Sequence, residues 1–65
     1  MNLYRVKTLV YALIDIYVTG ETVEIALSKI KEKLGDNYAD FETIEMIATT
    51  INARGSFYNG ILVLD

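Results

Sequence analysis

The sequence has no cysteine, no histidine and no proline among its 65 residues. The absence of cysteine excludes disulfides and thiol nucleophiles, and the absence of both cysteine and histidine removes the usual zinc ligands. Without histidine, the chain also lacks the side chain that most often carries acid–base catalysis. No glycine-rich phosphate loop or nucleophile motif is present either. We therefore expect a protein that is not an enzyme, with no catalytic residues, no metal site and no cofactor.

The short length leaves few ways to stabilise a fold. Residues 1–65 are enough for a single domain only. A chain of this size buries only about 60% of the surface that its unfolded form exposes, so a solitary monomer is marginally stable. Small domains usually add disulfides, a structural metal or a partner subunit. Because the first two are not expected here, we expect a homodimer.

Charged residues are few and unevenly distributed along the chain. Residues 1–33 carry five basic and four acidic residues, whereas residues 34–65 carry one basic and five acidic residues, which gives the net charge of −3. Such an acidic chain is disfavoured as a nucleic-acid binder, because affinity for nucleic acid comes largely from neutralising phosphates. The asymmetry is typical of an ordinary solvated surface and is also compatible with a basic partner.

The longest apolar region, Leu9–Val18, is too short to cross a membrane. A spanning helix needs about 20 apolar residues, and Asp15 interrupts this region. No small-residue cleavage site follows it, as a secretory signal would require. We expect a cytoplasmic protein that does not bind membranes.

A helix is predicted from Thr22 to Leu34. Its apolar side chains recur at helical spacing and form one stripe: Val23, Leu27, Ile30 and Leu34. Thr22 is suited to cap the first turn, and lysines lie in the last turns, where positive charge is favoured. Gly35 is placed to end the helix in a left-handed conformation.

A short hairpin is predicted at the end of the sequence. Asn59-Gly60 is a strong signal for a two-residue type I′ turn, which needs a positive φ at both positions. The turn lies between Ser56-Phe57-Tyr58 and Ile61-Leu62-Val63-Leu64.

The segment Leu3–Thr19 fits two patterns. At a spacing of two, its apolar side chains fall on one face that is interrupted only by Thr8, while at helical spacing they also form a stripe. The many β-branched and aromatic residues favour a strand. Because the segment is long for one strand, we predict two strands, Leu3–Val10 and Ala12–Thr19, with a turn near Tyr11.

The segment Asp40–Ala53 is equally ambiguous. Phe41, Ile44, Ile47, Ala48 and Ile51 would line one face of a helix. The same segment is rich in threonine and isoleucine, which favours a strand in which Ile44, Met46 and Ala48 share a face.

Residues 3–48 resemble a group of small proteins encoded by phages and other mobile elements. The resemblance lies in the strand-like Tyr4-Arg5-Val6 and Ile16-Tyr17-Val18-Thr19-Gly20, the helix Glu24–Ile30 ending at Lys33-Leu34-Gly35, and the strand-like Phe41-Glu42-Thr43-Ile44-Glu45. It implies a β-β-α-β arrangement and no catalytic activity. With the terminal hairpin added, we predict an α+β fold in the order β-β-α-β-β, with a small antiparallel sheet and one main helix.

The alternative architecture is three helices followed by a β-hairpin, as in a winged-helix domain. It requires that Leu3–Val18 and Asp40–Ala53 are both helices. The protein would then be a DNA-binding regulator that presents its third helix to DNA. That helix would offer Glu42 and Glu45 to the phosphates and no basic residue before Arg54, so we favour the α+β arrangement.

One face of the predicted strands is left without cover. A single helix covers one face of a sheet, so Leu9, Tyr11, Leu13 and Tyr17 on the other face would be exposed to water. Exposed apolar patches usually mark interaction sites, and tyrosine is enriched in them. We therefore predict a protein-interaction module that dimerises through these four residues, and the resemblance adds binding and inhibition of a host or defence protein. The alternative is that Phe57, Tyr58 or the termini cover this face within the monomer.

Overall fold

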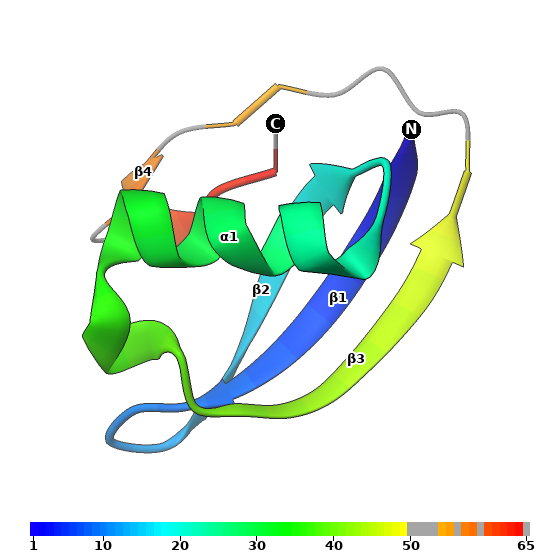
Figure 1. Ribbon diagram of the computed structural model, residues 1–65. Coiled ribbons are helices and arrows are strands. Elements are labelled where there is room, and N and C mark those ends of the chain that lie inside the picture. The colour runs from blue at the N-terminus through cyan, green and yellow to red at the C-terminus, as the bar shows by residue number, and fades with distance from the viewer. Residues whose placement is uncertain (50–53, 56, 59, 65) are drawn as a thin grey trace.

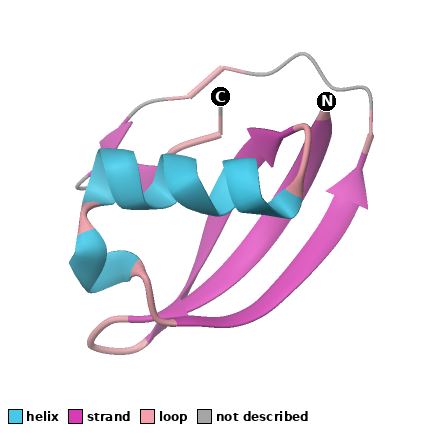
Figure 2. Ribbon diagram, viewed as in Figure 1, coloured by secondary structure: helices cyan, strands magenta, loops and turns pink. Residues whose placement is uncertain are grey.

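A computed structural model describes residues 1–49, 54–55, 57–58 and 60–64 of the chain. The elements are β1 (Asn2–Leu9), β2 (Leu13–Gly20), helix α1 (Val23–Leu34), the 3-10 helix η1 (Asp36–Tyr38), β3 (Phe41–Ala48), β4 (Phe57–Tyr58) and β5 (Ile61–Leu62). Figure 1 shows α1 lying across one face of a three-stranded sheet, and Figure 2 shows the two layers by element type. The predicted α+β fold in the order β-β-α-β-β is confirmed.

The first two strands form an antiparallel hairpin. They pair without a break from Asn2 opposite Gly20 to Leu9 opposite Leu13, and residues 10–12 form the turn. The prediction of two strands with a turn near Tyr11 is confirmed, and the single-strand and helical alternatives are wrong. The β-branched composition decided the structure here, because such side chains pack well on a pleated sheet.

Strand β3 pairs with the other side of β1, which gives the strand order β2-β1-β3. The strand alternative for Asp40–Ala53 is therefore correct as far as Ala48, and residues 50–53 lie outside the described part of the chain. The winged-helix alternative is wrong, because two of its three helices are strands. Ile44 and Met46 do share a face, but a register shift between Leu3 and Tyr4 pairs Ala48 with Leu3 on the opposite face.

Helix α1 is capped as its sequence predicts. The side chain of Thr22 accepts a hydrogen bond from the backbone N–H of Ile25 at 3.2 Å, and the N–H of Gly35 closes the last turn on Lys31 O at 2.9 Å. Gly35 has φ 97° and ψ 171°. Its φ is positive as predicted, but its ψ lies outside the left-handed helical region, in a region that is essentially open to glycine alone.

The helix packs close to the end of β2. A Cβ atom on Gly20 would lie only 2.9 Å from the backbone nitrogen of Ala26, which is closer than such atoms approach in practice. Glycine at this position therefore allows the first turns of α1 to rest directly on the strand.

The core lies between the sheet and α1. Its buried apolar side chains come from every layer: Tyr4, Val6, Ile16, Val18, Ala26, Ile30 and Val63. We call the sheet face that points to the helix the inner face, and the opposite one the outer face. Val6 is in the middle of the inner face, between Ile16 of β2 and Ile44 of β3.

The C-terminal segment returns to the free side of β2. Strands β4 and β5 pair as the predicted hairpin. Gly60 does not have a positive φ, so the type I′ prediction is wrong there, and Asn59 lies outside the described residues. The residues of β4 and β5 that do have a positive φ are Phe57, Tyr58 and Ile61. Beyond the hairpin, Leu64 forms a parallel bridge with Val18 and accepts a hydrogen bond from the N–H of Thr19 at 3.0 Å.

Candidate interaction surface

Three of the four predicted surface residues gather at the tip of the β1–β2 hairpin. Leu9 and Leu13 are cross-strand partners in the last pair before the turn, and Tyr11 lies in the turn itself. The side chain of Tyr11 is fully exposed, while Leu13 is 55% and Leu9 is 40% exposed. We call these three residues the hairpin tip. Large apolar side chains that remain this accessible form an exposed patch on a small domain.

The fourth predicted residue, Tyr17, lies further along β2 and is only partly exposed. It is paired with Arg5 of β1, whose guanidinium also contacts the carboxylate of Glu45 on β3. The Glu45 carboxylate and then the Tyr17 hydroxyl raise the pKa of Arg5 above its ordinary value. Tyr17 is therefore part of a polar network in the middle of the outer face, next to the hairpin tip rather than in it.

The outer face carries balanced charges. In addition to the pair between Arg5 and Glu45, Lys7 Nζ lies 3.3 Å from an oxygen of Asp15. Lys7 and Asp15 are cross-strand partners, as are Arg5 and Glu45, so each ion pair follows directly from the strand register. The centre of this face is thus electrically neutral although the whole chain has a net charge of −3.

The C-terminal hairpin does not cover the outer face. Val63 is completely buried in the core on the inner side, and Ile61 packs against that core. The Tyr58 hydroxyl lies 3.3 Å from Lys33 Nζ of α1, and Phe57 is exposed. The alternative in which Phe57 or Tyr58 shields the apolar residues of the outer face is therefore wrong, because this hairpin packs on the helix side of the sheet.

An apolar cleft that the sequence does not predict adjoins the hairpin tip. It has a volume of about 230 Å³ and lies between the β1–β2 turn, η1 and β5; its lining residues are Val10, Tyr11, Ala12, Ile14, Tyr38 and Ile61. Acidic residues and asparagine surround Tyr38 in the sequence, which indicates a polar loop there. The only signal that could have found Tyr38 is the occurrence of a large aromatic residue in an otherwise polar turn.

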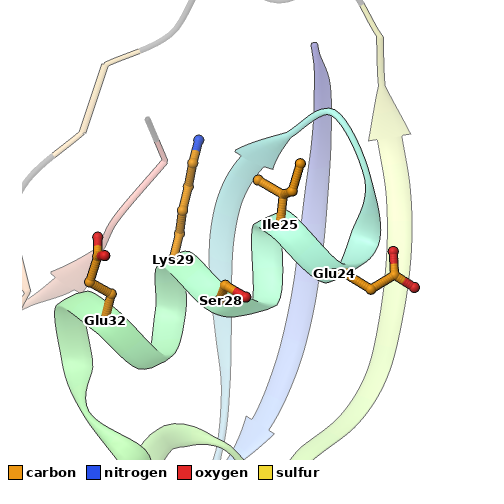
Figure 3. Close-up of a pocket in the computed structure, with 5 residues that line it drawn as sticks. All are labelled: Glu24, Ile25, Ser28, Lys29 and Glu32. Carbon is orange, nitrogen blue, oxygen red and sulfur yellow. The ribbon is translucent and has the colours of Figure 1, made fainter.

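The other depressions offer less for recognition. One of about 260 Å³ runs along α1 and is lined by Glu24, Ile25, Ser28, Lys29 and Glu32. Figure 3 shows Ile25, Lys29 and Glu32 extending roughly parallel from the helix and Glu24 and Ser28 pointing away from them, so the five side chains do not converge on one point. Another of about 350 Å³ shares Val10, Tyr11 and Tyr38 with the apolar cleft and is lined in addition by Asn37. Within the described ranges, no group of three or more acidic residues is arranged to hold a metal ion.

The described residues also include no helix that is long and apolar enough to cross a membrane. Compared with models of protein families, with curated proteins and with solved structures, the chain gives no significant match.

Proposed function

We propose that the protein is a non-enzymatic protein-interaction module that forms a homodimer through its hairpin tip and the adjacent outer face. The observation that carries the proposal is the exposure of Leu9, Tyr11 and Leu13 together at one end of the molecule. Burying such side chains on association is favourable by roughly 25 cal/mol for each Å² of apolar surface removed from water.

The charge of the outer face supports a second copy as the partner. Two copies of an acidic protein repel each other, and the repulsion is smallest where the meeting surfaces are locally neutral. The two ion pairs of the outer face meet that condition. A two-fold arrangement would place the hairpin tip of each copy against the same surface of the other, as most homodimers do.

The apolar cleft supports recognition of protein side chains. Its volume of about 230 Å³ is below the roughly 300–1,000 Å³ of pockets that enclose small-molecule ligands. Tyr11 and Tyr38 at its rim are of a residue type that is enriched at the energetic centre of interfaces. The cleft is therefore suited to receive a side chain of the partner.

The resemblance to small phage and mobile-element proteins supplies the finer proposal that this surface also binds and inhibits a host or defence protein. Affinity capture from host lysate with the wild type and with Leu13→Glu tests it. A protein retained by the wild type and lost with the variant supports the proposal, and equal retention by both contradicts it.

Sedimentation equilibrium tests the homodimer. Tyr11→Glu and Leu13→Glu each place a charge in the apolar contact, so we expect the dimer dissociation constant to rise by about 30-fold or more. Both side chains are exposed in the monomer, so the circular dichroism spectra of the variants should match the wild type.

The matched control is Ile25→Glu. Ile25 is 44% exposed, close to the value for Leu9, but it lies on α1 away from the hairpin tip. A glutamate there also completes a capping box with Thr22, which favours the helix. A wild type that remains monomeric at high protein concentration, or an equal loss of dimer with Ile25→Glu, would contradict the proposed homodimer.

A further inference from the structure

Strand β3 forms an open edge of the sheet. It spans eight residues and pairs with β1 on one side, and no other strand of the described residues pairs with its second side. The opposite edge, on β2, is occupied near its end by the backbone of Leu64. A free edge exposes a row of backbone N–H and C=O groups that can pair with another extended chain.

The inner face of β3 is apolar and uncovered. Ile44 and Met46 are cross-strand partners of the buried Val6 and Tyr4, yet Ile44 is 41% and Met46 is 54% exposed. Figure 1 shows why: α1 crosses over β2 and β1, and β3 lies beyond the helix. An added strand would place its inward side chains beside Ile44 and Met46 and would extend the apolar layer.

The charge of this edge is negative. Glu42 and Glu45 are exposed on the strand, and Asp40 immediately precedes it. Residues 34–53 contain no lysine or arginine. Among the described ion pairs, Glu45 contacts Arg5, and neither Asp40 nor Glu42 has a partner.

We infer that β3 binds an extended segment of a partner protein in which basic side chains alternate with apolar ones. The segment adds to the sheet as a fourth strand, with its apolar side chains next to Ile44 and Met46. Its lysine or arginine side chains meet Glu42, and they join the existing ion pair between Glu45 and Arg5. Backbone hydrogen bonds then supply affinity, and the alternating side chains supply specificity.

A second copy of this chain does not fit the same edge. Antiparallel pairing of β3 with itself would bring Glu42 and Glu45 of both copies into one short ladder. Like charges on facing strands are destabilising. The basic partner segment is therefore distinct from the partner proposed for the hairpin tip, and the two surfaces can be tested separately.

The test uses amide NMR titration with three eight-residue peptides. The first alternates valine with lysine, the second alternates valine with glutamate, and the third repeats the first with N-methyl groups on alternate residues. We expect the valine–lysine peptide to shift the amides of residues 41–48 and to bind at least about tenfold more tightly than the valine–glutamate peptide. The N-methylated peptide should not bind, because its ladder N–H groups are missing.

Protein variants locate the site. Glu42→Lys should weaken binding of the valine–lysine peptide by about tenfold, and Glu42→Gln replaces it if that variant does not fold. Glu32→Lys, an equal charge reversal on the exposed side of α1, should leave binding unchanged. Leu13→Glu should also bind the peptide normally, so failure of the homodimer and failure of this inference remain distinguishable.

Four results would overturn the inference. They are equal binding of the N-methylated peptide, equal binding of the valine–glutamate peptide, amide shifts that leave residues 41–48 unchanged, and no binding at millimolar peptide. If protein concentration alone shifts the β3 amides of the Leu13→Glu variant, in which the hairpin-tip dimer is weakened, the occupant is a second copy and the basic partner is wrong.

Discussion

The two edges of the three-stranded sheet are strands of equal length that share one partner, yet only one of them is covered. β2 and β3 each span eight residues and pair antiparallel with β1. On either side of Val6, Ile16 is completely buried while Ile44 is 41% exposed. Two isoleucine side chains in one row of the sheet therefore differ in exposure. The length and the antiparallel pairing of β2 and β3 do not explain this difference, because they are the same for both strands.

Chain connectivity explains it. Helix α1 starts after only Glu21 and Thr22 beyond the end of β2, so it must fold back over the hairpin that precedes it. The C-terminal segment also returns to β2, where Leu64 pairs with its free side. β3 arrives after the helix and pairs on the far side of β1, and no described element follows that covers it. Stability is thus concentrated at one edge, and the accessible backbone is at the other.

The largest predicted effect compares Ile16 with Ile44. Ile16→Ala removes buried methylene groups and leaves a cavity, so we expect it to lower the free energy of unfolding by about 3 kcal/mol. Ile44→Ala should cost about 1 kcal/mol, because water already reaches that side chain. Guanidinium denaturation at one protein concentration measures both, which keeps any dimer contribution constant.

The milder substitutions Ile16→Val and Ile44→Val allow the same comparison if the alanine variant does not fold. The total stability of a domain this size is roughly 3–10 kcal/mol, so Ile16→Ala could unfold it. Ile16→Val should then cost about 1 kcal/mol, and Ile44→Val a fraction of that. Equal losses at the two positions would show that β3 is covered in solution.

The second prediction concerns the β2 edge, which pairs with Leu64. Truncation after Val63 removes Leu64 and Asp65, and with Leu64 the backbone hydrogen bonds to the N–H of Thr19 and to the carbonyl of Tyr17. We expect a loss of about 2 kcal/mol, since each hydrogen bond contributes roughly 1 kcal/mol. Hydrogen exchange should show faster exchange of the Thr19 amide. If that amide exchanges at the same rate after truncation, Leu64 does not protect the edge.

The sequence predicts where the helix and strands lie better than it predicts which of them are shielded from water by other elements. The helix at Thr22–Leu34 could be located because the cap, the apolar spacing and Gly35 are all local signals that agree. Residues 41–51 fit a helix and a strand equally well, because their apolar residues satisfy both periods. The free hydrogen-bonding side of β1 decided between them, and that is a non-local effect which no window of sequence contains.

The same limit applies to the candidate surfaces. The hairpin tip could be predicted because alternation of side chains and the presence of one helix leave Leu9, Tyr11 and Leu13 without cover. The open edge could not, because the strand order β2-β1-β3 and the register shifts within β3 arise from pairing of distant segments. The place of Tyr38 in the apolar cleft could not be predicted for a similar reason, since only the folded chain brings η1 beside the β1–β2 turn.

The smallest predicted effect concerns Thr8, a polar residue within the apolar part of the inner face. Thr8 is completely buried, and its hydroxyl has no hydrogen-bond partner among the described protein groups. Its neighbours in the row, Ile14 of β2 and Phe41 of β3, are both partly buried against the core. At this end of the sheet the two edges are therefore covered alike, and the contrast between them is confined to the rows of Tyr4 and Val6.

Thr8→Val tests whether the difference between the two edges is confined to the rows of Tyr4 and Val6. Valine has nearly the same shape and removes the buried hydroxyl, so we expect the free energy of unfolding to rise by about 1 kcal/mol. Stability rises only if water does not reach the Thr8 side chain from either neighbouring strand. Phe41 of β3 must therefore be shielded from water as well as Ile14 of β2. Denaturation measurements that show a loss of stability instead would mean that the Thr8 hydroxyl is hydrated from the β3 side. The uncovered part of the inner face would then run along the whole of β3 and not only beside Ile44 and Met46.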